Sequence, residues 1–75
     1  MKLRELRIQK FIGLRDLADK AGVAVSTITA IEGGRELPML RTVRKLADAL
    51  EVDPNEIDEA RAAAERALEG KKEVA

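Results

Sequence analysis

The chain has 75 residues, enough for one small domain, and its 45% hydrophobic and 37% charged residues are typical of a folded globular protein. It contains no cysteine and no histidine, so disulfide scaffolds, thiol catalysis, structural zinc sites and Ser-His-Asp triads are excluded. Phe11 is the only aromatic residue, which argues against an aromatic platform for single-stranded nucleic acid. The sequence contains neither a signal peptide nor an apolar run near the roughly 20 residues of a membrane span, so we expect a cytoplasmic protein.

The net charge is zero, with 14 basic and 14 acidic side chains, but the charges are unevenly distributed. Residues 1–45 carry 10 basic and 5 acidic side chains, whereas residues 46–75 carry 4 basic and 9 acidic ones. The basic part is suited to face an anion such as nucleic acid. The alternative is a solvated surface laced with salt bridges.

Apolar residues recur at helical spacing and predict helices over about 2–10, 14–21, 25–33, 40–50 and 54–70. The last helix has the clearest start signal, with Asp53 as N-cap, Pro54 as first residue and Glu56 completing a capping box. We therefore expect an all-α domain over 1–57, a long C-terminal helix over 54–70 continuous with it, and a frayed tail over 71–75. The expected core is Leu3, Leu6, Ile12, Leu17, Ala18, Ala21, Val23, Ile28, Ile31, Leu40, Val43, Leu46, Ala47, Leu50, Val52 and Ile57.

Residues 17–32 have the pattern of a helix-turn-helix. Gly22 permits the left-handed backbone of a three-residue turn, and Val23 fills the angle between the two helices. Ile28 and Ile31 anchor the second helix to the core. The outer face of that helix, which enters the major groove in a helix-turn-helix protein, then consists of Val25, Ser26, Thr29 and Ala30.

The chain resembles the Xre/Cro (lambda-repressor-like) helix-turn-helix regulators from about Leu3 to Ile57. The resemblance implies a five-helix, lambda-repressor-like DNA-binding domain with the helix-turn-helix at helices 2 and 3. It is carried by an ordered set of short motifs at unbroken spacing: Leu3-Arg4-Glu5-Leu6-Arg7, Leu17-Ala18, Ala21-Gly22-Val23, Ser26-Thr27-Ile28, Ile31-Glu32, Gly34-Arg35, Pro38, Leu40-Arg41-Thr42, Lys45-Leu46-Ala47 and Ala49-Leu50.

The resemblance also implies roles for individual residues. Arg7 and Glu32 match an ion pair between the first helix and the end of the recognition helix; the alternative is two independent surface charges. Phosphate contacts are implied near the start of the second helix, in and after the recognition helix, and at the start of the fourth, at Arg15, Thr27, Arg35, Arg41 and Thr42. Arg35 and Arg41 are the preferred candidates; the alternative is that both only keep the surface soluble.

Three residues depart from the family pattern in the DNA-facing part. Leu14 and Val25 replace polar side chains that often contact DNA, and Ala24 replaces a better N-cap. Val25 offers only apolar contact to a thymine methyl, and Ser26 and Thr29 offer one hydrogen bond each. These departures indicate modest sequence specificity, reliance on DNA shape, or a loss of DNA binding.

Two further departures concern helix ends. Phe11 and Glu51 stand where the family often has a glycine after the first and fourth helices, so we expect the first helix to run a residue or two longer than usual. Ile8 lies three residues before Phe11, and together they form a candidate contact patch for a protein partner. The alternative is that Phe11 folds back onto the domain.

The fifth helix carries a stripe of small and apolar residues. We expect a homodimer contact there; the alternative is an alanine-rich helix that is stable by propensity alone. The stripe is Ile57, Ala60, Ala64, Ala67 and Leu68.

The leading hypothesis is a sequence-specific regulator of transcription that binds double-stranded DNA as a homodimer on an inverted repeat. The alternative is a protein-interaction module on the same fold, an antitoxin or accessory factor with weak or no DNA binding. We expect no enzyme activity, cofactor, metal or small-molecule effector site, because the chain lacks the commonest catalytic and metal-ligating residues.

Overall fold

A computed structural model describes the backbone of residues 1–74 and the side chains of residues 1–70. This part of the chain contains five α-helices, one short 3₁₀ turn and no strand, which confirms the expected all-α class. The elements are α1 Leu3–Gln9, α2 Leu14–Ala21, α3 Val25–Glu32, α4 Leu40–Leu50, η1 Pro54–Glu56 and α5 Asp58–Val74.

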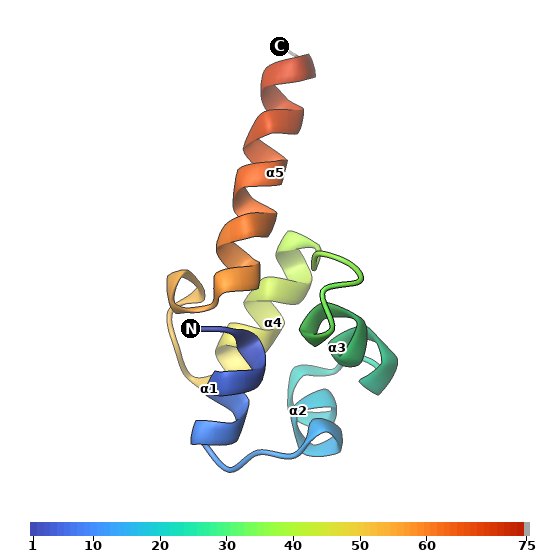
Figure 1. The fold of residues 1–75 in the computed structure, drawn as a ribbon, viewed down its shortest axis with the longest axis vertical. Coiled ribbons are helices and arrows are strands. Elements are labelled where there is room, and N and C mark those ends of the chain that lie inside the picture. Colours follow the sequence, from blue (N-terminus) through green and yellow to red (C-terminus); the bar gives the residue numbers. More distant parts are fainter. Residues whose placement is uncertain (75) are drawn as a thin grey trace.

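The first four helices and η1 surround the core, and α5 projects away from them (Figure 1). The molecule is 42 Å long but only 21 and 19 Å across, because the second half of α5 extends beyond the rest. The start of α5 lies beside the N-terminus of α1, and α1 and α3 lie on opposite sides of this view (Figure 1). The helix-turn-helix segment is therefore at the other end of the molecule from the tip of α5.

The core follows the sequence prediction closely. Of the sixteen expected core residues, twelve are buried, and Ile12, Val23 and Val52 are half-buried against them. The prediction that Leu40 is a core residue is wrong. Its side chain is 50% exposed, because Leu40 is the first residue of α4 and lies at the edge of the core. The structure adds two residues from α5 that the prediction left out, Ala60 and Ala63.

The first four helices all end in a Schellman motif, with a left-handed residue directly after the last turn. Gly22 and Gly34 take this position after α2 and α3, with φ of 70° and 74°. Phe11 and Glu51 take it after α1 and α4, with φ of 57° and 56°. The closing N–H···O bonds are Ile12 to Arg7 at 3.0 Å, Val23 to Ala18 at 3.0 Å, Arg35 to Ala30 at 2.9 Å and Val52 to Ala47 at 3.1 Å.

The first helix is therefore not extended, contrary to the sequence prediction. It ends at Gln9, and Phe11 adopts the conformation that glycine takes elsewhere. The two N–H groups that a longer helix would pair with carbonyls four residues back close the motif instead: Phe11 N–H donates to the Ile8 carbonyl at 2.9 Å and Ile12 N–H to the Arg7 carbonyl. The roughly 1–2 kcal/mol cost of a left-handed residue with a side chain is offset by tertiary contacts that this turn permits: Ile12 packs against the core, and its carbonyl accepts a hydrogen bond from Arg7.

The predicted fifth helix is divided in the structure. Asp53 accepts a hydrogen bond from Asn55 N–H at 2.8 Å, and Glu56 from Asp53 N–H at 3.0 Å, so the capping box forms. It closes only the 3₁₀ turn η1, because Ile57 is extended and α5 begins at Asp58. This break lets Ile57 enter the core, which is worth about 1.5–3 kcal/mol.

The predicted end of this helix at Gly70 is also wrong, since α5 runs to Val74. A glycine costs a helix only about 1 kcal/mol, and Leu68, Glu69 and Lys71 around it favour helix. The predicted fraying of residues 71–75 remains a prediction: Ala75 lies outside the described residues, as do the side chains of the whole segment.

Hydrogen bonds between residues distant in sequence join the start of α5 to the start of α1. The Glu59 carboxylate accepts a hydrogen bond from Leu3 N–H at 2.9 Å, and Asp58 N–H donates to the Met1 carbonyl at 2.8 Å. The carboxylate satisfies a free N–H group of α1 and complements the positive end of its dipole.

Replacing either left-handed side chain by glycine should stabilise the domain. We expect Phe11→Gly and Glu51→Gly each to raise the free energy of unfolding by about 1 kcal/mol, because the relief of strain exceeds the added entropy of the unfolded chain. Urea denaturation measures this. Lys10→Gly is the control: Lys10 has an ordinary φ of −91°, so glycine there should destabilise. If Phe11→Gly were less stable than the wild type, the conclusion that Phe11 has a strained backbone conformation would be wrong.

Candidate nucleic-acid interface

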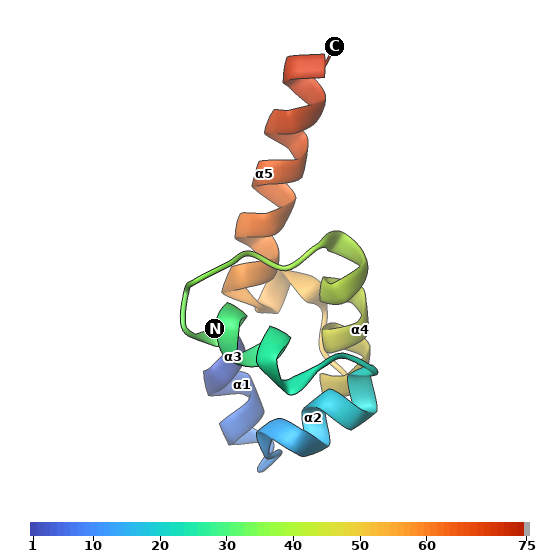
Figure 2. The same ribbon diagram turned by 90° about the vertical axis from the view of Figure 1, so that its right-hand side faces the viewer.

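The helix-turn-helix is built by α2, a turn of three residues and α3. Gly22 ends α2 in the left-handed conformation, and Val23 is half-buried between the helices. Ile28 and Ile31 are fully buried, which fixes the rotation of α3 about its own axis. Figure 2 shows α3 at the front of one face, with α2 below it and the α3–α4 loop above. The fold thus presents α3 at the surface, as a recognition helix requires.

The outward face of α3 has the four residues that the sequence predicted, and it is short and largely apolar. Val25 is 37% exposed, Ser26 is exposed, and Thr29 and Ala30 are half-buried. Thr29 donates its hydroxyl hydrogen to the Ser26 carbonyl at 3.0 Å, so this donor is already used within the helix. Ala24 makes no side-chain capping bond at the start of α3.

Three arginines border this face in the chain. Arg15 follows the first residue of α2, Arg35 follows α3, and Arg41 is the second residue of α4. All three are exposed and form no ion pair with a residue whose side chain the structure describes. The other two predicted phosphate contacts, Thr27 and Thr42, are half-buried.

Lys45 is a further cation on the same helix face as Arg41, and it was not among the predicted phosphate contacts. It is exposed and lies four residues after Arg41 in α4. Residues four apart share a helix face, so this spacing was the available signal.

The predicted Arg7–Glu32 ion pair forms and has bidentate geometry. The Arg7 Nε and Nη2 atoms donate to the two carboxylate oxygens of Glu32 at 2.9 and 3.1 Å, and Nη1 donates to the Ile12 carbonyl at 3.1 Å. The side chains are only 11% and 8% exposed. The hydrogen bonds that Arg7 donates to the Glu32 carboxylate raise the pKa of Arg7 above its ordinary value although burial acts against this, so Arg7 stays charged.

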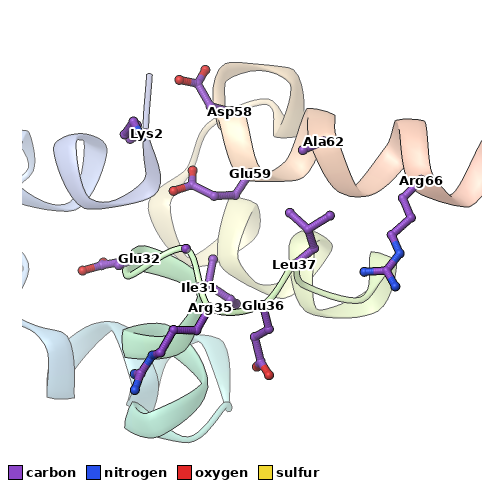
Figure 3. Close-up of a pocket in the computed structure, with 11 residues that line it drawn as sticks. Lys2, Ile31, Glu32, Arg35, Glu36, Leu37, Asp58, Glu59, Ala62 and Arg66 are labelled. Atoms are coloured by element: carbon purple, nitrogen blue, oxygen red, sulfur yellow. The ribbon is translucent and has the colours of Figure 1, made fainter.

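A surface groove of about 440 Å³ lies where α1, the α3–α4 loop and α5 meet (Figure 3). Leu37 points from the loop toward α5, and Arg66 reaches back from α5 toward the loop (Figure 3). Two of its carboxylates, Glu32 and Glu59, already accept hydrogen bonds from Arg7 and from Leu3 N–H. The groove is therefore the boundary between three packed elements, and these hydrogen bonds hold the elements together.

The two predicted partner patches differ in the structure. Phe11 is 96% exposed and Ile8 is 52% exposed, so Phe11 does not fold back onto the domain. In the α5 stripe, the prediction that Ala60 contributes to a contact surface is wrong. Ala60 is buried in the core, because α5 packs against α4 and η1 at this position.

The outer part of the α5 stripe remains accessible. Leu68 is 60% exposed and lines a groove of about 270 Å³ with Leu40. A second groove, of about 240 Å³, lies between the same part of α5 and the start of α4. We call this surface the α4–α5 apolar face; its residues are Met39, Leu40, Ala64, Ala67 and Leu68.

No helix in the described part of the chain is long and apolar enough to cross a membrane. Nor do the described residues contain a group of three or more acidic side chains placed to hold a metal ion.

Comparison with known families agrees with this geometry. The family model described as "Helix-turn-helix domain" matches residues 1–60. The chain belongs to this helix-turn-helix family, and it is of the Xre/Cro type.

Among curated proteins, the chain is similar to the cryptic phage CTXphi transcriptional repressor RstR of Vibrio cholerae. The two are 39% identical over 46 residues, which cover 61% of this chain and 41% of RstR. The chain thus matches less than half the length of that relative. No solved structure matches the chain significantly.

Breaking the buried ion pair should cost far more than breaking a surface pair. We expect Glu32→Ala and Arg7→Ala each to lower the free energy of unfolding by about 3–5 kcal/mol, because each leaves a buried charge without its partner. The double variant should lose much less than the sum of the two. Urea denaturation measures all three, with Glu32→Gln as a milder variant if the alanine forms do not fold.

Asp58→Ala is the control, because its ion pair with the N-terminal amine is exposed and should contribute at most about 1 kcal/mol. Additive losses in Arg7→Ala and Glu32→Ala would contradict a coupled pair.

Proposed function

We propose that this protein is a sequence-specific regulator of transcription that binds double-stranded DNA, and not an enzyme. This proposal depends on the orientation of α3. Two buried isoleucines anchor one face of this helix to the core, so the opposite face lies at the surface. The family membership and the similarity to a transcriptional repressor support the same function. Repression is the mode of action that the relative's name suggests for this chain.

In the docking that we propose, the first turns of α3 enter the major groove. Val25, Ser26, Thr29 and Ala30 face the base edges, and arginines from three elements contact phosphates on either side. Exposed cations suit this role, and among the side chains of residues 1–70 no carboxylate forms an ion pair with these arginines. The phosphate contacts would be Arg15, Thr27, Arg35, Arg41 and Thr42, with Lys45 added.

We further propose that two copies bind an inverted repeat, joined through the α4–α5 apolar face. Its exposed leucines, Leu40 and Leu68, are costly to leave in water, and its small alanines allow a second helix to approach closely. A two-fold axis through this face would place two recognition helices on successive turns of one side of the DNA.

Removing a phosphate contact should weaken binding to all sequences alike. We expect Arg41→Ala to lower affinity by roughly fivefold for every duplex and to reduce the slope of log affinity against log salt by about one. Fluorescence anisotropy over a salt series measures both. Arg4→Ala removes the same charge from α1, on the other side of the molecule, and should leave the slope nearly unchanged. An unchanged slope in Arg41→Ala would show that this docking is wrong.

A charge on the α4–α5 apolar face should separate the two copies. We expect Leu68→Glu and Leu40→Glu to raise the dimer dissociation constant by about tenfold or more, because each buries a carboxylate in an apolar contact. Sedimentation equilibrium measures this, and circular dichroism verifies folding. Glu69→Gln, next to Leu68 but away from the stripe, is the control. A wild-type monomer at all concentrations would contradict the dimer.

Phe11 favours a second function, a protein-interaction module such as an antitoxin or accessory factor on the same fold. An aromatic side chain that is 96% exposed and held in a strained backbone conformation contributes nothing to the core. Phe11→Ser should then abolish binding of a protein encoded beside this chain while leaving DNA affinity unchanged. A parallel loss of DNA affinity would place Phe11 in the DNA interface instead.

A further inference from the structure

The recognition helix carries an unusual set of groups for reading bases. Its outward face has no long polar or charged side chain among Val25, Ser26, Thr29 and Ala30. It cannot form the bidentate hydrogen bonds by which arginine reads guanine or glutamine reads adenine. What α3 does present is methyl groups, from Val25, Thr29 and Ala30.

The hydrogen bond within α3 reduces its polar groups further. Because Thr29 donates its hydroxyl hydrogen to the Ser26 carbonyl, Thr29 keeps only acceptor capacity and its methyl group toward a partner. Ser26 is then the one remaining side-chain donor on this face. Val25 stands at the first position of the helix and is 37% exposed, so it is well placed for apolar contact.

In the major groove, thymine alone among the four bases carries a methyl group, at C5. We propose that this protein recognises its half-site chiefly through thymine C5-methyl groups, with Val25 as the main specificity-determining residue. This inference rests on the proposed function. It adds the chemical feature of the DNA that is read, and it sets a modest limit on specificity, because burying one methyl is worth about fourfold in affinity.

The test removes the methyl and nothing else. A duplex selected by the protein from a random library supplies the half-site, and each thymine is replaced in turn by deoxyuridine. Dissociation constants are measured by anisotropy at one stated salt concentration. We expect one or two positions in each half-site to lose about fourfold, and about 16-fold when both halves of a symmetric site are substituted. The remaining thymines should show no change.

Two variants assign the contact to α3. Val25→Ala should bind the thymine and deoxyuridine duplexes equally well at the most sensitive position. Leu37→Ala is the matched control, since it truncates an aliphatic side chain with the same 37% exposure as Val25 but outside α3, and it should preserve the difference. Both should retain the helical circular dichroism of the wild type, because both side chains lie outside the core.

A gain of binding completes the test. Changing the sensitive thymine to cytosine should weaken binding, and 5-methylcytosine at that position should recover about fourfold, because it restores a methyl group at C5. Selected sites that bind tightly but are indifferent to deoxyuridine would overturn this inference and leave DNA binding intact. Failure to select or bind any duplex would overturn the proposed function and this inference with it.

Discussion

The buried Arg7–Glu32 ion pair connects three parts of this small domain. The Arg7 guanidinium holds the carboxylate at the end of α3 with two nitrogens and the Ile12 carbonyl, ahead of α2, with the third. One side chain of α1 therefore fixes both the link into the helix-turn-helix and the end of its second helix. Both charges are largely removed from water, so each depends on the other for its neutralisation.

The helix ends provide the second constraint. Short helices of seven to eleven residues have little stability of their own, so where they stop decides how they can pack. The same left-handed closure ends each of the first four helices. At Phe11 and Glu51 this closure forms despite the side chain, which indicates that packing, and not local preference, selects the conformation.

These constraints also shape the outward face of α3, which has few polar groups. Two isoleucines set the rotation of α3. Three exposed arginines, which form no ion pair with any side chain that the structure describes, lie on the adjoining elements. The acidic residues gather in the last 30 residues, many of them on α5, which projects away from the helix-turn-helix. This separation leaves an excess of basic residues in the part of the chain that contains the helix-turn-helix, although the net charge is zero.

The sequence by itself determined the features that depend on local pattern and spacing. Apolar spacing predicted four helices within a residue or two and the outward face of α3, and the family resemblance predicted the Arg7–Glu32 pair. Only the tertiary structure decided the features that depend on competition between distant contacts. Burial of Ile57 and Ala60 against α4 and η1 divides the predicted fifth helix and removes part of its apolar stripe from the surface. Packing also leaves Leu40 and Phe11 exposed, since a helical pattern indicates which residues share a face but not what covers that face.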